Sequence, residues 1–257
     1  MTYFYDYYAK EYREIHKDKL LPAPAAILCG IESTGIQDCR RNLKNAFATY
    51  NEGGNKEMLK MLLAEYREYI AGLQDEHAKE RYNAFVYRYM AETHVGMKAI
   101  GGKLGVTKET IYVYINRVLD ELLMLCIGMP AVKKLPENKE DVVCILIEGS
   151  RIFHEMAGDY IVNLFSGKRE QTIIEKSRQL TKNIMEKFEA VVREYSVYCN
   201  DEDTRIDTDV RKAVVLEKCI AGVPVAVIAE ECGVCENTIY ADIRENEKRL
   251  AAMLFEM

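Results

Sequence analysis

The sequence predicts an all-α protein. Apolar residues recur at spacings of three and four along most of the chain, which is the period of an amphipathic helix, and only five of the 257 residues are proline. Apolar residues make up 49% of the chain and charged residues 30%, a composition typical of a folded globular protein rather than a disordered one. The length allows one large domain or two modest ones.

In the first half, four helices are expected before any motif. A tyrosine-rich start, residues 3–15, predicts a helix that packs by its aromatic face, and Pro22 and Pro24 interrupt the chain after it. A polar helix is expected over residues 37–50, and Asp75 is expected to cap a helix that runs to about residue 92. Between them, residues 56–72 carry one apolar stripe, formed by Leu59, Leu62, Leu63, Tyr66, Tyr69 and Ile70.

In the second half, residues 128–138 are expected to form a linker. An apolar segment follows at residues 142–147, then a segment that ends at Ser166 and Gly167, and an acidic loop is expected at residues 200–209. A long amphipathic helix is expected over residues 169–198. Its apolar stripe is interpreted as intramolecular core, with a homodimer seam as the alternative, and consists of Ile173, Ile174, Leu180, Ile184, Phe188, Val191, Val192 and Tyr195.

Charge and hydropathy exclude several classes of protein. With 35 basic and 41 acidic residues the net charge is -6, which argues against a general nucleic-acid binder, because such proteins are usually basic. Residues 142–147 form the longest uncharged apolar run, far short of the ~20 residues that a membrane span needs, so no membrane association is expected. The start lacks the features of a signal peptide, and the eight cysteines are therefore expected to be reduced in a cytoplasmic protein.

An internal repeat relates residues 98–115 to residues 226–243. Gly-Val and Thr-Ile-Tyr stand at matching positions of the two copies without a gap: Gly105, Val106, Thr110, Ile111 and Tyr112 in the first, and Gly233, Val234, Thr238, Ile239 and Tyr240 in the second. A helix is expected upstream of each copy, at residues 81–92 and 209–221. The sequence thus predicts two helical modules, residues 1–128 and 129–257, each ending in a helix-turn-helix, at about residues 97–118 and 225–247.

The residue types at these positions suit a helix-turn-helix. Ile100 and Leu104 share one helix face, and the small residue Gly101 lets two helices cross closely. Gly105 suits the left-handed conformation of the turn, and Thr107 can cap the following helix. The apolar face of that helix is then held against the first helix, and its other face is free to enter a DNA major groove.

The run over residues 100–112, Ile-small-x-x-Leu-Gly-Val-Thr-x-x-Thr-Ile-Tyr, resembles the helix-turn-helix of sigma factor region 4 and of related resolvase-type and phage regulator domains. The resemblance covers about 45 residues of each half. It implies a regulator of transcription that binds double-stranded DNA, and RNA polymerase as a partner if the protein is sigma-like. The second copy departs from the pattern at Cys232, which replaces Leu104, and at Cys235, a poor cap in place of Thr107.

Carried over onto this sequence, the resemblance assigns recognition helices to residues 107–118 and 235–247. Candidates for base or phosphate contact are Thr107, Lys108, Glu109, Thr110, Tyr112 and Asn116 in the first copy, and Glu236, Asn237, Thr238, Tyr240 and Arg244 in the second. Candidates for phosphate contact alone are Lys98, Lys103 and Arg117.

The two copies differ in charge. Residues 98–117 hold four basic residues and one acidic residue, whereas residues 226–245 hold one basic and five acidic residues. Since phosphate neutralisation supplies much of the affinity for DNA, the first copy is expected to bind DNA better. The second is expected either to contact bases with little help from phosphates or to contact protein. The whole net charge of -6 lies in residues 129–257, because residues 1–128 have equal numbers of basic and acidic residues.

No catalytic, metal or cofactor site is expected. Cys232 and Cys235 form a Cys-x-x-Cys pair near Cys219, the spacing of a zinc half-site or redox pair, yet the repeat assigns them to a core and a capping position. Residues 96–104 resemble a phosphate-binding loop, but Gly102 stands where lysine is required. The alternatives to a DNA-binding regulator are a sigma-like polymerase factor, for which no promoter-melting segment is found, and a non-enzymatic phage packaging subunit or adaptor.

Overall fold

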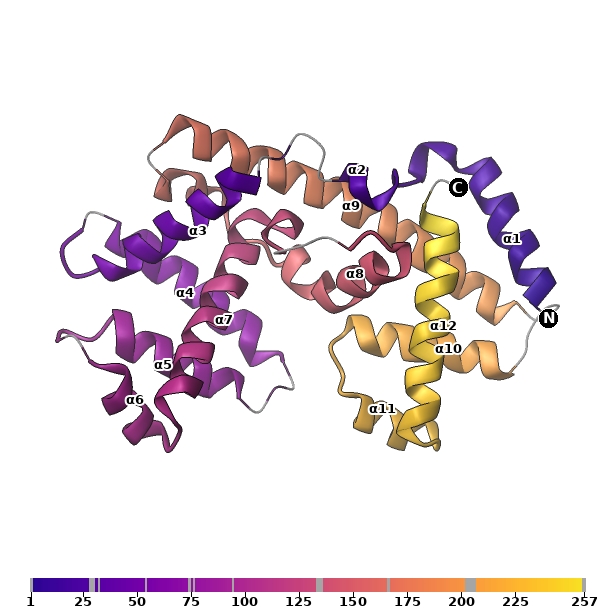
Figure 1. Cartoon of the computed structure of the whole chain (residues 1–257). Helices are drawn as coiled ribbons and strands as arrows, with labels where there is room; N and C mark the ends of the chain where they lie inside the picture. The colour runs from indigo at the N-terminus through magenta and orange to yellow at the C-terminus, as the bar shows by residue number, and fades with distance from the viewer. Residues whose placement is uncertain are drawn as a thin grey trace. The chain divides into compact units, whose positions relative to one another are not determined.

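A computed structural model describes residues 2–27, 31, 33–53, 55–73, 75, 77–93, 95–132, 136–165, 167–201 and 207–255 (Figure 1). Within these residues the secondary structure consists of α-helices and short 3-10 helices, with one isolated bridge between Leu21 and Phe255 and no strand. The predicted all-α class is confirmed. None of the described helices is long and apolar enough to cross a membrane.

The chain is divided into two compact units, and each unit is formed by segments that are separated in the sequence. The central unit comprises Gly30–Lys133 and Glu155–Thr181, and the terminal unit comprises Met1–Cys29, Lys134–His154 and Lys182–Met257. These boundaries differ from the expected modules at residues 1–128 and 129–257. The reason is packing between distant segments: the N-terminal helix packs against the C-terminal helix, and residues 159–164 pack against a helix of the first half.

The central unit is built around α7. It contains α3 (Ser33–Ala48), α4 (Lys56–Ala71), α5 (Ala78–Tyr89), α6 (Met97–Leu104), α7 (Lys108–Ile127), the 3-10 helices η2 (Met129–Ala131) and η3 (Asp159–Leu164), and the start of α9 (Lys168–Asn200). Helices α3, α4, α5 and α6 all pack against α7. The six residues of the apolar stripe predicted for residues 56–72 are all buried on α4.

Three expectations for the central unit need correction. The helix expected at residue 37 begins at Ser33. Asp75 does not cap α5, whose N-cap is His77; its carboxylate accepts a hydrogen bond from the His77 N–H at 2.9 Å. The expected linker at residues 128–138 begins with the buried turn η2, where the Met129 N–H donates to Thr181 Oγ1 at 2.9 Å. Residues 133–135 of that linker, and Ser166, lie outside the described residues.

The terminal unit is built around α12. It contains α1 (Thr2–Ile15), η1 (Lys17–Lys19), α2 (Pro24–Ile27), α8 (Lys139–His154), the rest of α9, α10 (Asp207–Ile220), α11 (Val225–Cys232) and α12 (Glu236–Leu254). Helices α1, α8, α10 and α11 pack against α12. At the end of α12 the Arg13 guanidinium donates to the Ala252 carbonyl, and the Leu21 N–H donates to the Leu254 carbonyl at 2.7 Å.

The predicted segments 142–147 and 169–198 lie inside α8 and α9. Most of the α9 stripe is buried, which confirms its interpretation as core; Leu180 and Val192 are half-buried. The expected acidic loop is shorter, because Asp207 and Asp209 belong to α10 and Asp209 is buried. Residues 202–206 lie outside the described residues. In the tyrosine-rich start, Tyr12 is buried and Tyr7 is exposed, and the side chains of residues 3–5 lie outside the described residues.

Candidate nucleic-acid interface

The first helix pair, α6–α7, is joined by a tight turn. Gly105 ends α6 in the left-handed conformation, with φ 71°, as the sequence predicts. The Val106 N–H returns to the Gly101 carbonyl at 3.0 Å, which satisfies one of the last carbonyls of α6. Thr107 then caps α7, and its Oγ1 accepts a hydrogen bond from the Thr110 N–H at 3.2 Å. The predicted cap and left-handed turn are both confirmed.

The second helix pair, α11–α12, has the same turn at the matching place of the repeat. Gly233 has φ 65°, and the Val234 N–H returns to the Ala229 carbonyl at 3.1 Å. The cap differs as expected, because the Cys235 side chain makes no capping bond to the backbone. Its Sγ lies 3.3 Å from Thr238 Oγ1, and this bond holds the pKa of the exposed Cys235 thiol below its usual value.

The residue whose carbonyl accepts this turn hydrogen bond is glycine in the first pair and alanine in the second. A Cβ added to Gly101 would lie 2.6 Å from the Val106 carbonyl oxygen, a distance that requires the backbone to shift. The matching residue of the second pair is Ala229, which is buried in a small core with Val215, Ile228 and Ile239. Gly101 is therefore required by a close approach, but to Val106 and Thr107 of the turn rather than to the crossing helix that the sequence predicts.

No family model, curated protein or solved structure matches this chain.

The exposed face of α7 begins at its first turn. Lys108, Glu109, Tyr112 and Val113 are exposed there, Tyr112 by 60% and Val113 by 61%. These residues follow a spacing of one and four, so they share one face of the helix. The opposite face, with Ile111, is buried. The described geometry thus leaves one face of the N-terminal half of α7 free.

Val113 was not singled out from the sequence. An apolar residue in a helix is ordinarily counted as core, and this hid its position. Val113 lies four residues after Glu109 and directly after Tyr112, and both of these were already assigned to the outer face. This spacing could have predicted that Val113 is exposed. An exposed apolar side chain in this place is able to contact a thymine methyl group.

Three predicted contact residues of α7 are engaged within the protein. The Thr110 Oγ1 lies 3.0 Å from that of Thr107. The Asn116 side chain donates to the Tyr112 carbonyl at 2.9 Å and accepts from Arg40 at 3.3 Å. Arg117 binds Glu121, with its Nε 2.9 Å from Oε1. These bonds compete with contacts to a base or phosphate.

The predicted phosphate-contact lysines are exposed on the first helix pair. Lys98 and Lys103 are exposed on α6 and Lys108 on α7. The Lys103 ammonium lies 5.0 Å from the centre of the Tyr87 ring, a cation–π contact that leaves its charge in place. The first pair therefore carries three exposed ammonium groups.

On the second pair the exposed face has matching positions. Glu236, Asn237, Tyr240 and Arg244 are exposed on α12, Tyr240 by 45%, and Thr238 is half-buried. Tyr240 stands at the position of Tyr112, and Arg244 stands at that of Asn116. All the predicted residues of the second copy thus lie on or beside one face.

The acidity of the second pair is reduced by ion pairs within the terminal unit. Asp242 is buried and binds Arg211, with the Nε–Oδ2 distance 2.6 Å. Glu231 pairs with Lys218, and Glu245 pairs with Arg249. Of the five acidic residues between 226 and 245, these three are matched by cations of α10 and α12. The exposed negative charge falls on Glu230 and Glu236.

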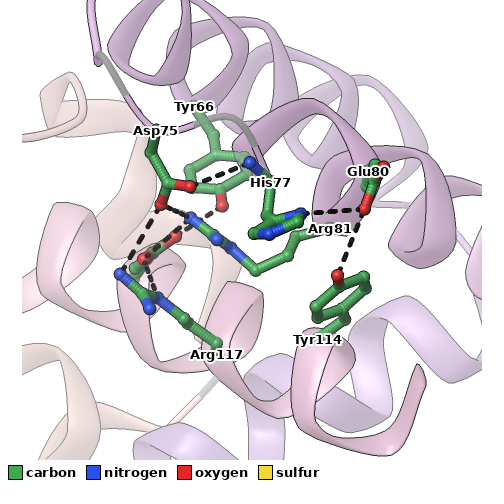
Figure 2. Close-up of polar contacts among 8 residues, drawn as sticks. Tyr66, Asp75, His77, Glu80, Arg81, Tyr114 and Arg117 are labelled. Atoms are coloured by element: carbon green, nitrogen blue, oxygen red, sulfur yellow. Dashed lines mark hydrogen bonds and ion pairs between the residues drawn. The ribbon is translucent and has the colours of Figure 1, made fainter. Parts of the chain in front are cut away.

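Figure 2 shows a polar network that fastens α5 to α7 in the central unit. Arg81 is 3% exposed, and its Nη2 lies 2.6 Å from Asp75 Oδ2 and 4.0 Å from Glu121 Oε1. The Tyr66 hydroxyl donates to Glu121 at 2.5 Å, and burial followed by the charge of Glu121 raises the pKa of Tyr66. The Arg81 bond keeps the pKa of Asp75 below its usual value. The network thus holds α7, the second helix of the first pair, against α5.

Three members of this network have counterparts in the terminal unit, with their charges reversed. In the register of the repeat, Asp209 of α10 is the counterpart of Arg81, and Arg249 of α12 is the counterpart of Glu121. Arg249 Nη1 lies 3.0 Å from Asp209 Oδ1. The third members also match, because Glu245, bound to Arg249 at 3.0 Å, is the counterpart of Arg117. The structural repeat therefore extends beyond the sequence motif, since it includes a buried ion pair between α5 and α7 in one unit and between α10 and α12 in the other.

Cys232 and Cys235 have different surroundings. Cys232 is half-buried and packs against the small core of the second pair, whereas Cys235 is exposed. Among the described residues, no group of three or more histidine, cysteine or acidic side chains is arranged to hold a metal ion.

Proposed function

We propose that this protein is a sequence-specific DNA-binding regulator of transcription, in which each helix pair is a helix-turn-helix and α7 enters the major groove. The observation that carries the proposal is the free face of α7, which presents Lys108, Tyr112 and Val113 directly after a capped, glycine-containing turn. This is the part of a recognition helix that reaches base edges.

In the proposed complex, Lys98, Lys103 and Lys108 neutralise phosphates and position the helix, which are contacts without sequence information. Tyr112 and Val113 face bases, and Val113 suits the methyl group of thymine. Asn116 and Arg117 need to release their internal partners before they contact DNA, so we assign them a secondary role. The second pair contributes Asn237, Tyr240 and Arg244.

A regulator of this kind works in the cytoplasm. Its partners are double-stranded DNA and, in a sigma-like role, RNA polymerase. No catalytic step is included in this proposal.

Selection of bound sequences from a random pool of double-stranded DNA tests the proposal. The full chain is expected to enrich a motif, whereas Tyr112→Ala is expected to change or abolish the motif. Lys108→Ala is expected to keep the motif and weaken binding. Lys44→Ala removes an exposed lysine of α3 and serves as the control, with no expected effect. An unenriched pool, or equal losses for the control and the α7 variants, would contradict the proposal, and a ring-shaped oligomer in solution would instead favour the packaging role.

A further inference from the structure

A cavity of about 530 Å³ lies between α8 and the second helix pair in the terminal unit. This volume is within the range of small-molecule sites. Apolar residues of α8, α10, α11, α12 and the turn at residues 222–224 line it, and charged residues join them from α8 and α12. The lining includes Cys144, Ile147, Glu148, Cys219, Ile243 and Glu247.

The repeat identifies Glu247 as an unusual residue of this cavity. Its counterpart in the first copy is Leu119, which is 1% exposed in the core of the central unit. The second copy thus has a half-buried carboxylate where the first has a core leucine. A charge in a core position is costly unless it is paired, so its presence beside a cavity calls for a counter-charge.

The groups around Glu247 act on its charge in opposite directions. Burial raises its pKa first, and the charges of Glu148 and Asp141 raise it further, whereas a hydrogen bond from Cys144 and the charge of Arg244 oppose the rise. Burial and the two glutamates raise the pKa of the Cys144 thiol to about 12. Burial also raises that of Cys219, to about 11. Both thiols are therefore neutral at physiological pH, and the negative charge of the cavity lies on the two glutamates.

We propose that this cavity binds a small organic cation, an amine carried on a short apolar chain. The ammonium group lies between Glu148 and Glu247 and relieves the repulsion of two like charges in a partly buried site. The apolar chain packs on Ile147 and Ile243, which supply wall without charge. The lining thus matches a molecule with one cationic end and one apolar end.

The bound amine also affects DNA contact, a step that rests on the proposed function. Tyr240 and Arg244 line the cavity and lie on the exposed face of α12. An ammonium beside Glu247 offsets the attraction between this carboxylate and the charge of Arg244, which leaves the guanidinium more available to a phosphate. The cavity would then be an effector site that strengthens the second helix pair as a DNA contact.

Isothermal titration calorimetry on the full chain without DNA tests the cavity. The probes are n-hexylamine, 1,5-diaminopentane and phenethylamine, with 1-hexanol and hexanoate as the neutral and anionic analogues of the first. We expect saturable binding of one amine per chain, at least tenfold tighter than binding of the alcohol, and no binding of hexanoate. Absence of saturable binding for all three amines, or equal binding of hexylamine and hexanol, would overturn the proposal.

Variants locate the binding. Glu247→Gln and Glu247→Leu, the latter restoring the residue of the first copy, are expected to weaken amine binding tenfold or more while the variants melt no lower than the wild type. Glu236→Gln removes an exposed carboxylate of the same helix outside the cavity and is expected to leave affinity unchanged. An equal loss for Glu236→Gln would show non-specific charge attraction and overturn the assignment.

Binding of DNA with and without amine tests the coupling separately. We expect a tighter complex in saturating amine for the wild type and no change for Arg244→Ala. If amine binds but DNA affinity does not change, the coupling is wrong and the cavity stands. If the chain selects no DNA sequence at all, the proposed function fails while the calorimetric result keeps its meaning.

Discussion

Gly101 and Gly102 are neighbours on α6 with opposite surroundings. A Cβ at Gly101 meets the Val106 carbonyl oxygen, whereas a Cβ at Gly102 meets nothing within 4 Å. Gly101→Ala is therefore expected to lower the free energy of unfolding by about 1–3 kcal/mol, the usual cost of overpacking. Gly102→Ala is expected to raise it by about 0.5–1 kcal/mol, because alanine restricts the unfolded chain and favours helix.

Urea denaturation of the two variants measures this contrast. Both substitutions add one methyl group to the same helix, so each is the control for the other. Equal effects of the same sign would contradict the close approach at the first turn.

Glu247 predicts a dependence of stability on pH. Its pKa is raised in the folded protein, so the folded state binds more protons than the unfolded state between the ordinary value of 4.5 and the folded pKa. The free energy of unfolding should therefore rise as the pH falls through this window. Glu247→Gln should remove this contribution and stabilise the protein at neutral pH, measured as denaturation midpoints from pH 4.5 to pH 8. A steeper pH dependence in the variant would refute the raised pKa.

At this scale the sequence could predict what the backbone requires. Gly105 and Thr107 were predicted because a left-handed turn and a helix cap restrict residue type locally. The partners of Asn116 and Arg117 were not predicted, because Arg40 and Asp75 are brought to them by tertiary packing.

The buried pair between an upstream helix and a last helix occurs in both units with opposite polarity. Arg81 pairs with Glu121 in one, and Asp209 pairs with Arg249 in the other. If α5 packed on α12, Arg81 would face Arg249, and if α10 packed on α7, Asp209 would face Glu121. Like charges buried together are strongly unfavourable. The reversed polarity therefore discriminates against mispairing of two similar helix sets in one chain.

Separate removal of Arg81 and Arg117 compares the contributions of a buried and an exposed ion pair to the free energy of unfolding. Arg81→Met removes the buried guanidinium that pairs with both Asp75 and Glu121 and should cost about 3–5 kcal/mol. Arg117→Met removes a side chain that is 58% exposed and should cost about 1 kcal/mol or less. Chemical denaturation of both variants gives the two values. Similar losses would mean that the interhelical pair has no special role.

Whole helices were predicted well where an apolar stripe is long, as in α4 and α9. The ends of helices were less well predicted, as the start of α3 at Ser33 and the buried turn after Gly128 show. Capping by backbone groups and burial of a short turn depend on residues that are far away in the sequence. The sequence motif also gave no indication of the reversed network, since its members lie outside the repeated run.

For the whole molecule, the net charge of -6 is less of an obstacle to DNA than it first suggests, because residues 1–128, which contain the first helix pair, balance in charge. Glu230→Lys combined with Glu236→Lys should convert the second pair into a phosphate-binding surface. The slope of log affinity against log salt should then become steeper by about 0.9 for each new phosphate contact. Fluorescence anisotropy with a fixed duplex measures the slope.

Glu217→Lys and Lys44→Ala are separate controls that change one exposed charge outside the two helix pairs, and each is expected to leave the slope nearly unchanged. An unchanged slope for the double variant at 230 and 236 would mean that the second pair does not approach DNA.

The division of the chain into two units could not be predicted at all from the sequence, because it depends on contacts between the two ends of the chain.

The packing of α1 against α12 has a consequence for synthesis. Arg13 and its partner Ala252 are 239 residues apart, so α1 leaves the ribosome long before the helix that covers it exists. At about 5–20 residues per second the delay is on the order of ten to fifty seconds. The central unit completes its segments by Thr181 and is able to fold first, whereas the newborn α1 must stay protected from aggregation until the last helix emerges.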